Sequence, residues 1–384
     1  MNANSLLWRR SIVDFFRKAK NRMSHFLKPL LLILTIVCSI LPLSAQTIEP
    51  PKVAFLYLSP ADDATGWTKQ HERGRRAASA FFGPKAQLDF FENIPDSAAA
   101  LPLMRQLALD GYDMFFCSSI VFQDAAINLS FEFPDVKIEV ATGYVRTDNL
   151  ATYSARFYEG RYVHGLIAGL VTKTNKIGFI ASLPTPEVLR GLNAAFLAAR
   201  SVNPDVTFDI AWTNSYYNPE REEQAARQLV QDGADILMQS TYTPRPMQVA
   251  EELGIHAFGW ASEMREYGPN ASLTSTIDHW GPYYIGRIRA LIDGRWAPNE
   301  SVNSMGSNTQ IIGRLSEDIP NRVTLLALDT ISRLRKGELH PFTGPIRRQG
   351  GTGWLAAGET ASESELLTMN FFVEGITGII PKME

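Results

Sequence analysis

Short runs of β-branched and aromatic residues alternate with amphipathic segments along the chain, and a series of four such runs occurs twice. The first series of runs is VAFLYLS, AQLDFFEN, YDMFFCSS and VKIEVATGY, and the second is KIGFIASL, VTFDIAWTN, ADILMQST and HAFGWAS. A segment with helical periodicity follows nearly every run, which is typical of βαβ units and parallel sheets. Eight such strands and the remaining chain are too many for one sheet, so the sequence predicts an α/β protein with two doubly wound parallel-sheet lobes.

The boundary between the two predicted lobes is placed near residues 172–176. Under this hypothesis the first lobe comprises residues 46–171 and part of 285–384, and the second comprises residues 172–284 with the hinge crossings. A Gly/Pro-rich segment, HPFTGPIRRQGGTG, belongs to the last part of the chain. Because several crossings between two open lobes make a hinge, we expect a ligand cleft between the lobes.

The first 45 residues have the pattern of an export signal. A basic region precedes the apolar run PLLLILTIVCSILPL, and small residues before Gln46 offer cleavage after Ala45. The apolar run is shorter than the ~20 residues of a membrane span, so a transmembrane anchor is disfavoured. Val37 stands before Cys38, where a lipoprotein signal has a small residue, so a lipid anchor is not expected. Either Met1 or Met23 is compatible with the true start.

Removal of that segment would leave 30 basic and 39 acidic residues, which changes the formal charge from −3 to −9. A chain this acidic, without a basic run, is a poor candidate for binding nucleic acid or an anionic membrane. Cys117 would be the single remaining cysteine, so an intrachain disulfide is excluded and the core must supply the stability.

Common catalytic and metal-binding patterns are missing from the sequence. It contains no GxSxG, HExxH or Walker-type motif, and GGTG at 350–353 follows no predicted strand, so it is interpreted as a flexible turn. The six histidines show no i, i+4 pairing, so no metal site and no cofactor are predicted. The adjacent Asp62 and Asp63 could alternatively belong to a metal-binding acidic loop of the kind that nucleoside hydrolases use.

Aromatic and polar residues collect at the carboxyl ends of the predicted strands, where open α/β sheets bind ligands. Aromatic walls suit a flat, neutral heterocycle, because offset stacking adds ~0.5–1.5 kcal/mol per ring pair. Polar neighbours could contact its edge. Packing of these rings in the core is the competing interpretation. The candidate ligand-binding residues are Trp67, Asp62, Asp63, Tyr144, Ser182, Thr241, Tyr242, Trp260, Ser262 and Asp278.

Long collinear stretches of the chain resemble the basic membrane protein family of solute-binding proteins, which contains purine-nucleoside receptors of ABC uptake systems. The resemblance covers residues 52–381. Its most extended motifs are GWTKQHERGR, YEGRYVHGLIAGLVTKTNKIGFIASLPTPEVLRGLNAAFLAARSVNP and AWTNSYYNPEREEQAARQLVQDGADILMQ. It implies a type I periplasmic-binding-protein fold, a monomer that holds a small ligand between two lobes, and delivery of that ligand to an ABC permease in the membrane.

The resemblance also implies roles for individual residues. Trp67 matches the aromatic that stacks on the base, and Asp62 or Asp63 matches a nearby carboxylate. Nucleoside-binding relatives have an aspartate that binds the ribose hydroxyls where this chain has Ala261, next to the bulky Trp260. This departure points to a free purine nucleobase, with adenine as the expected ligand.

Two other functions use the same kind of cleft. The chain could be a ligand-sensing module for a membrane signalling receptor, and a permease gene beside it would distinguish transport from sensing. It could also be a secreted purine nucleoside hydrolase, which would turn over its ligand. The absence of catalytic motifs favours a binding protein that is not an enzyme.

Overall fold

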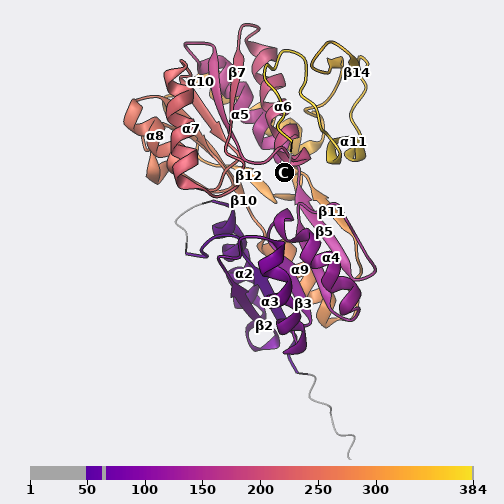
Figure 1. The fold of residues 1–384 in the computed structure, drawn as a ribbon. Coiled ribbons are helices and arrows are strands. Elements are labelled where there is room, and N and C mark those ends of the chain that lie inside the picture. Colours follow the sequence, from indigo (N-terminus) through magenta and orange to yellow (C-terminus); the bar gives the residue numbers. More distant parts are fainter. Residues whose placement is uncertain (1–48, 63–65, 383–384) are drawn as a thin grey trace, which may run out of the picture. The chain divides into compact units, whose positions relative to one another are not determined.

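Two six-stranded sheets, each covered by helices, make up the part of the chain that the computed structural model describes, residues 49–62 and 66–382 (Figure 1). The sheets belong to one unit that begins at Pro50. The predicted export segment 1–45, with its cleavage position and Cys38, lies outside the described residues, as does Asp63.

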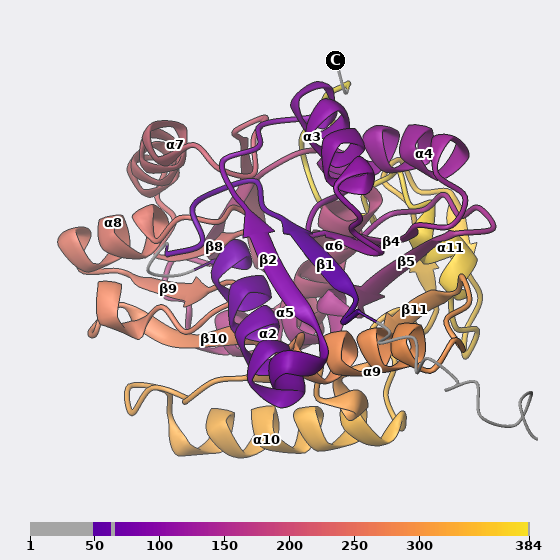
Figure 2. The same ribbon diagram turned by 90° about the horizontal axis from the view of Figure 1, so that it is seen from below.

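The first sheet is entirely parallel, with the strand order β11-β5-β4-β3-β1-β2. Alternate residues of β1 face opposite sides of the sheet. Val53 and Phe55 therefore belong to one hydrophobic cluster, and Ala54 and Leu56 belong to another. Helices α2 and α9 pack together, as do α3 and α4 (Figure 2). This first lobe contains β1 (Lys52–Leu56), β2 (Gln87–Phe91), β3 (Met114–Cys117), β4 (Lys137–Ala141), β5 (Leu150–Ala155), β11 (Glu300–Asn303), α2 (Trp67–Phe82), α3 (Ser97–Leu109), α4 (Gln123–Glu132) and α9 (Gly281–Ile292).

The second sheet has the order β12-β10-β9-β8-β6-β7 and is parallel except for β12, which pairs antiparallel with β10. Helices α5 and α6 make the most extensive helix pair, and α7 packs against α8. This second lobe contains β6 (Lys176–Ala181), β7 (Thr207–Trp212), β8 (Ile236–Gln239), β9 (His256–Gly259), β10 (Ser272–Asp278), β12 (Gln310–Ile312), α5 (Phe157–Val171), α6 (Pro186–Val202), α7 (Pro219–Gln231), α8 (Arg245–Leu253) and α10 (Asn321–Lys336).

The chain passes between the lobes three times within the described residues. It leaves β5 for α5, leaves β10 for α9, and returns from β11 to β12 through the short helix η4 (Met305–Ser307). Multiple adjacent connections of this kind let two lobes rotate about a hinge.

Sequence signals explain several helix ends. Helix α7 begins at a proline, and the side chain of Asn218 accepts a hydrogen bond from the Arg221 N–H. Helices α8 and α10 end at Gly254 and Gly337, which adopt the left-handed conformation of a C-terminal cap.

Two glycines of α5 let this helix lie directly against α6. A Cβ atom on Gly165 would overlap the carbonyl oxygen of Ala195, and one on Gly169 would lie 2.7 Å from that of Ala199. The backbones therefore pack closer than larger residues would permit.

The last part of the chain packs on the second lobe. Strands β13 (Ile346–Arg347) and β14 (Gly353–Leu355) form a hairpin. Its turn contains Gly350 and Gly351, which have positive φ angles, so the GGTG segment forms a turn as predicted. Asn193 of α6 donates to the Phe371 carbonyl and accepts from the Val373 N–H. The five-residue helix α11 (Glu363–Leu367) also contacts α6.

All eight predicted strands form, and the two-lobe α/β prediction is confirmed. Within the two six-stranded sheets, four strands were not predicted, β5, β10, β11 and β12, and the β13–β14 hairpin was not predicted either. Two of the four strands, LATYSA and SLTSTID, are rich in Ser and Thr and lack the aliphatic runs of the others, and the remaining two have four and three residues.

Candidate functional site

The aromatic residues that follow β1 and β8 meet between the two lobes. Trp67 opens α2, is almost completely buried, and donates from Nε1 to the Ser118 carbonyl at 2.5 Å. Tyr242 lies in the loop after β8, and its ring is nearly parallel to the indole, with a centroid distance of 5.8 Å and an interplanar angle of 9°. Two of the predicted ligand-binding residues are therefore stacked on each other across the lobes.

The spacing of these rings limits where a ligand can enter. A flat ring placed between two others needs contacts of ~3.5 Å on both faces, or ~7 Å in total. The observed 5.8 Å is smaller, so Trp67 and Tyr242 must separate or slide before a heterocycle can lie between them. Because the rings belong to different lobes, movement of one lobe relative to the other would change their spacing.

Further aromatic rings surround this pair. Phe157 and Trp280 meet Trp67 edge to face, at 5.5 and 5.9 Å, and Tyr216 stacks behind Tyr242 at 5.2 Å. These contacts form a continuous aromatic wall that reaches from α2 across to the second lobe.

Arg161 brings a positive charge to this cluster from the first turns of α5. Its side chain is buried, donates from Nη2 to the Gln239 carbonyl, and lies 3.6 Å over the ring of Trp260. Burial lowers the pKa of Arg161 to about 9, while Glu187 and Asp278 oppose that shift. The group remains a guanidinium at neutral pH.

Asp278 supplies a buried carboxyl group at the end of β10. Its Oδ1 accepts a hydrogen bond from Gln310 Nε2 at 3.0 Å. Burial raises the pKa of Asp278 to about 8, although the bond from Gln310 lowers it. The carboxyl is therefore mostly protonated at pH 7 and can donate as well as accept a hydrogen bond.

Several buried polar atoms around Asp278 have no hydrogen-bond partner among the described residues. Such atoms are rare in folded proteins and require an explanation. A ligand that carries both donors and acceptors would pair them. They are Asp278 Oδ2, Trp280 Nε1, Gln310 Oε1 and Arg161 Nη1.

Three predicted hydroxyl residues line the same interlobe region from the second lobe. The Ser262 hydroxyl accepts a hydrogen bond from the Gly66 N–H at 2.6 Å, which joins the two lobes. The Ser182 N–H donates to the Ser240 hydroxyl at 3.0 Å, and Thr241 is buried next to Tyr242.

Two described candidates lie apart from the stacked rings. Asp62 is exposed, and Tyr144 is 67% exposed at the edge of a separate pocket. Arg161 and Gln310 were not among the residues predicted from the sequence. An arginine within the apolar helix YEGRYVHGLIAGLVT was the available signal for Arg161, whereas nothing in the sequence marked Gln310.

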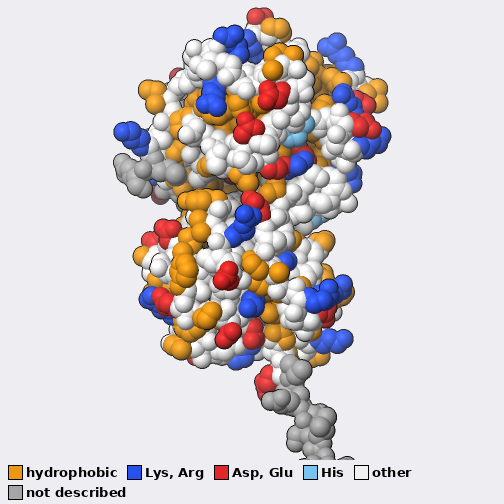
Figure 3. All heavy atoms as spheres, turned by 90° about the vertical axis from the view of Figure 1, so that its right-hand side faces the viewer, with side chains coloured by type: hydrophobic (Ala, Val, Ile, Leu, Met, Phe, Trp, Pro, Cys, Tyr) orange, Lys and Arg blue, Asp and Glu red, His pale blue; other side chains and the backbone are white. Residues whose placement is uncertain are grey.

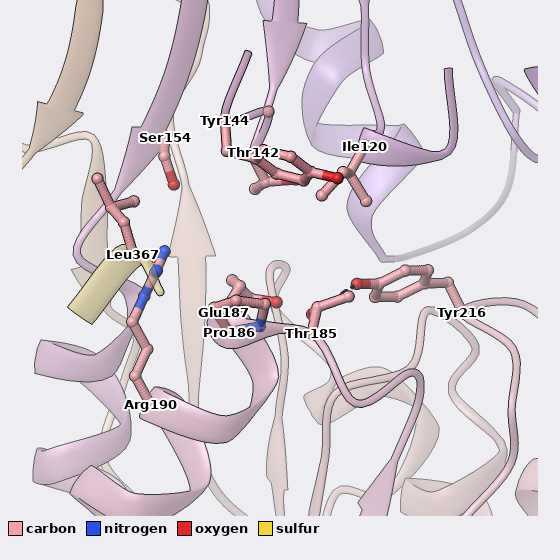
Figure 4. Close-up of a pocket in the computed structure, with 11 residues that line it drawn as sticks. Ile120, Thr142, Tyr144, Ser154, Thr185, Pro186, Glu187, Arg190, Tyr216 and Leu367 are labelled. Carbon is pink, nitrogen blue, oxygen red and sulfur yellow. Dashed lines mark hydrogen bonds between the residues drawn. The ribbon is translucent and has the colours of Figure 1, made fainter. Parts of the chain in front are cut away.

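A separate, small pocket is lined from both lobes (Figure 4). Its first-lobe residues face those at the start of α6. Tyr216, which backs Tyr242, also borders it, so the pocket adjoins the aromatic wall. The lining residues are Ile120, Thr142, Gly143, Tyr144, Ser154, Thr185, Pro186, Glu187, Arg190, Tyr216 and Leu367.

Comparison with known proteins identifies the family. Residues 51–325 match the family model described as "ABC transporter substrate-binding protein PnrA-like". The chain belongs to this family. The sequence-based resemblance is thus confirmed.

Relatives of this ABC transporter substrate-binding protein cover most of its length. A purine-binding protein of Brucella abortus is 41% identical over 88% of this chain and 96% of its own. A Haloferax volcanii protein, named as a glucose-binding protein of an ABC transporter, is 29% identical over 87% and 82%. The family and these relatives are solute-binding proteins, not enzymes.

The fold of the substrate-binding protein also matches solved structures. A solute-binding protein of an Aeropyrum pernix ABC transporter has a TM-score of 0.65 at 16% identity, over 78% of this chain and 93% of that one. This likeness supports the two-lobe fold. Within residues 49–62 and 66–382, no helix is long and apolar enough to cross a bilayer.

Proposed function

We propose that the protein captures a purine nucleobase, with adenine as the preferred ligand, and delivers it to an ABC permease. The observation that carries this proposal is the Trp67–Tyr242 stack between the lobes, bordered by the unpaired Asp278 Oδ2 and Trp280 Nε1. A heterocycle inserted there would be stacked on its faces and hydrogen-bonded at its edge.

Hydrogen-bond complementarity and sequence similarity to a purine-binding relative both support a purine as the ligand. A purine presents ring nitrogens as acceptors and N–H groups as donors, which complement a protonated carboxyl and an indole N–H. The Brucella abortus relative, 41% identical, is named as a purine-binding protein. We propose that the remaining predicted residues border the ligand or lie in the loops beside it. They are Asp62, Asp63, Ser182, Thr241 and Ser262.

The preference for a base over a nucleoside follows from Ala261 and Trp260. Ala261 is buried after β9 with a positive φ of 60°, and it supplies no carboxylate for ribose hydroxyls. Trp260 beside it is covered by the Arg161 guanidinium at 3.6 Å. The Trp260 indole and the Arg161 guanidinium therefore fill space beside Ala261.

The protein is further proposed to be exported, with cleavage of the signal after Ala45 and without a lipid anchor. The order of basic, apolar and small-residue regions supports this. N-terminal sequencing of the exported protein should begin at or near Gln46, and recovery of lipid-modified Cys38 at the mature terminus would contradict it. A monomer without affinity for nucleic acid is expected, and basic and acidic side chains are interspersed on the face drawn in Figure 3.

Calorimetry tests the ligand and the site together. The wild type should bind adenine more tightly than adenosine, guanosine, hypoxanthine or glucose. Truncation of the stacked wall in Trp67→Ala should weaken adenine binding by about 1–3 kcal/mol, a loss of one to two decades in affinity. Trp354→Ala, in the C-terminal hairpin, is the matched control and should bind normally.

Two results would contradict the proposal. Adenosine or glucose could bind the wild type better than adenine, or Trp67→Ala could bind adenine as well as Trp354→Ala does. Mass spectrometry of small molecules released by denaturing the purified protein identifies the ligand independently.

A further inference from the structure

Glu187 directs an unpaired carboxylate into the pocket between the lobes. In Figure 4 it lies at the start of α6, across from Thr142 and Tyr144 of the first lobe. Glu187 makes no hydrogen bond or ion pair with any of the described residues, and its side chain is only partly buried. Burial nevertheless raises its pKa, although Arg190 and Arg161 oppose this shift.

The surroundings of Glu187 have the features of an anion-binding site. Helix α6 has 17 residues, and its first turn has no side-chain cap, because the Thr185 hydroxyl is hydrogen-bonded to the Tyr216 hydroxyl at 3.2 Å. The N–H groups and the dipole at such a helix start favour a phosphate or a carboxylate.

Arg190 adds a buried donor to the same pocket. Its side chain is 4% exposed and donates from Nη1 to the Leu366 carbonyl at 3.2 Å. Its Nε has no partner among the described residues. A guanidinium with a spare donor beside a helix N-terminus would ordinarily attract a phosphate.

We propose that Glu187 acts as an internal anion that occupies this site and prevents phosphorylated ligands from binding at the mouth of the cleft. The carboxylate balances Arg190 and the helix start, so a phosphate entering the pocket meets a like charge. A neutral heterocycle with N–H groups meets an acceptor instead. The proposal deepens the proposed function, because it assigns Glu187 the discrimination of a nucleobase or nucleoside from its nucleotide.

The pocket is placed to exert this selection. Tyr216 borders it and stacks on Tyr242, which in turn stacks on Trp67. A substituent on a ligand held at the aromatic wall would extend toward Glu187. A neutral substituent can remain there, whereas a phosphate would be repelled.

Inorganic phosphate provides a test that does not depend on purine binding. Glu187→Gln should bind phosphate at least tenfold more tightly than the wild type in calorimetric titrations at low ionic strength. Glu220→Gln is the matched control, since Glu220 also follows a proline in the first turn of a helix but is exposed. The double variant Glu187→Gln, Arg190→Gln should lose the gained affinity.

Adenosine 5′-monophosphate extends the test to ligands of the proposed class. Its affinity relative to adenosine should rise at least tenfold in Glu187→Gln and remain unchanged in Glu220→Gln. Equal phosphate affinity in the wild type and Glu187→Gln, with both folded by circular dichroism, would overturn the inference. If Glu187→Gln does not fold, Glu187→Ser replaces it. Failure of adenine to bind any variant would refute the proposed function alone, because the phosphate titration still decides the role of Glu187.

Discussion

Gly66 packs so closely against Tyr242 that a Cβ atom on the glycine would overlap the carbonyl oxygen of the tyrosine. Gly66 also has a φ of +93°, a conformation that favours glycine. The two residues follow β1 and β8, which belong to different lobes. The backbones of the lobes therefore meet at a point where no side chain fits.

We expect Gly66→Ala to prevent full closure of the lobes. Its methyl group would hold the loops apart and thereby weaken adenine binding. Small-angle scattering with saturating adenine should give a larger radius of gyration for this variant than for the wild type. The control Gly83→Ala, at the other end of α2, has a positive φ but open space around the new Cβ, and it should close normally.

The stability of the protein should depend on pH through Asp278. Its folded pKa of about 8 lies above its ordinary value of 3.8, so the folded state holds the proton more tightly. The free energy of unfolding should therefore decrease as pH rises from about 4 to about 8, by up to ~1.4 kcal/mol per pH unit from this group.

Asp278→Asn removes this titration, so the difference in unfolding free energy between wild type and variant isolates it. Glu159, whose pKa burial raises to about 7, titrates in both proteins and cancels. Denaturant unfolding at several pH values between 5 and 8 measures the difference. A difference that does not change with pH would show that the carboxyl is not protonated in the folded protein.

Ala261→Asp should shift the preference from base toward nucleoside. Aspartate tolerates the positive φ at this position better than alanine does, and its carboxylate could accept ribose hydroxyls if Trp260 gives way. Adenine binding should be similar or weaker. Ala261→Asn has the same size without the charge, and an equal gain in adenosine affinity for Asn and Asp would contradict a role for the charge.

The surroundings of two helix glycines predict opposite effects for their replacement by alanine. Gly165→Ala should lower the free energy of unfolding by at least ~2 kcal/mol, because its Cβ has no space beside Ala195. Gly286 lies on the exposed face of α9, where a new Cβ would meet no atom within 4 Å, so Gly286→Ala should stabilise the protein by about 0.5–1 kcal/mol. Chemical denaturation compares both with the wild type.

Strand and helix periodicity predicted most of the fold, because buried parallel strands such as KIGFIA are continuous apolar runs. The same reasoning missed β10, which is buried although four of its seven residues are Ser or Thr. Trp67 and Tyr242 were both candidate ligand-binding residues from their positions after predicted strands, but their direct stacking across the two lobes was not predicted. The pairing of Asp278 with Gln310 was beyond sequence reasoning, since β12 has three residues and its register depends on tertiary contacts.

The glycine-mediated contact of α5 with α6 has a consequence for the electrostatics of the cleft. Arg161 lies near the start of one helix, and Glu187 and Arg190 near the start of the other. Because the two helix backbones lie directly against each other, the starts of both helices move together as parts of the second lobe. The backbones that carry these charges therefore keep their mutual spacing when the lobes move relative to each other.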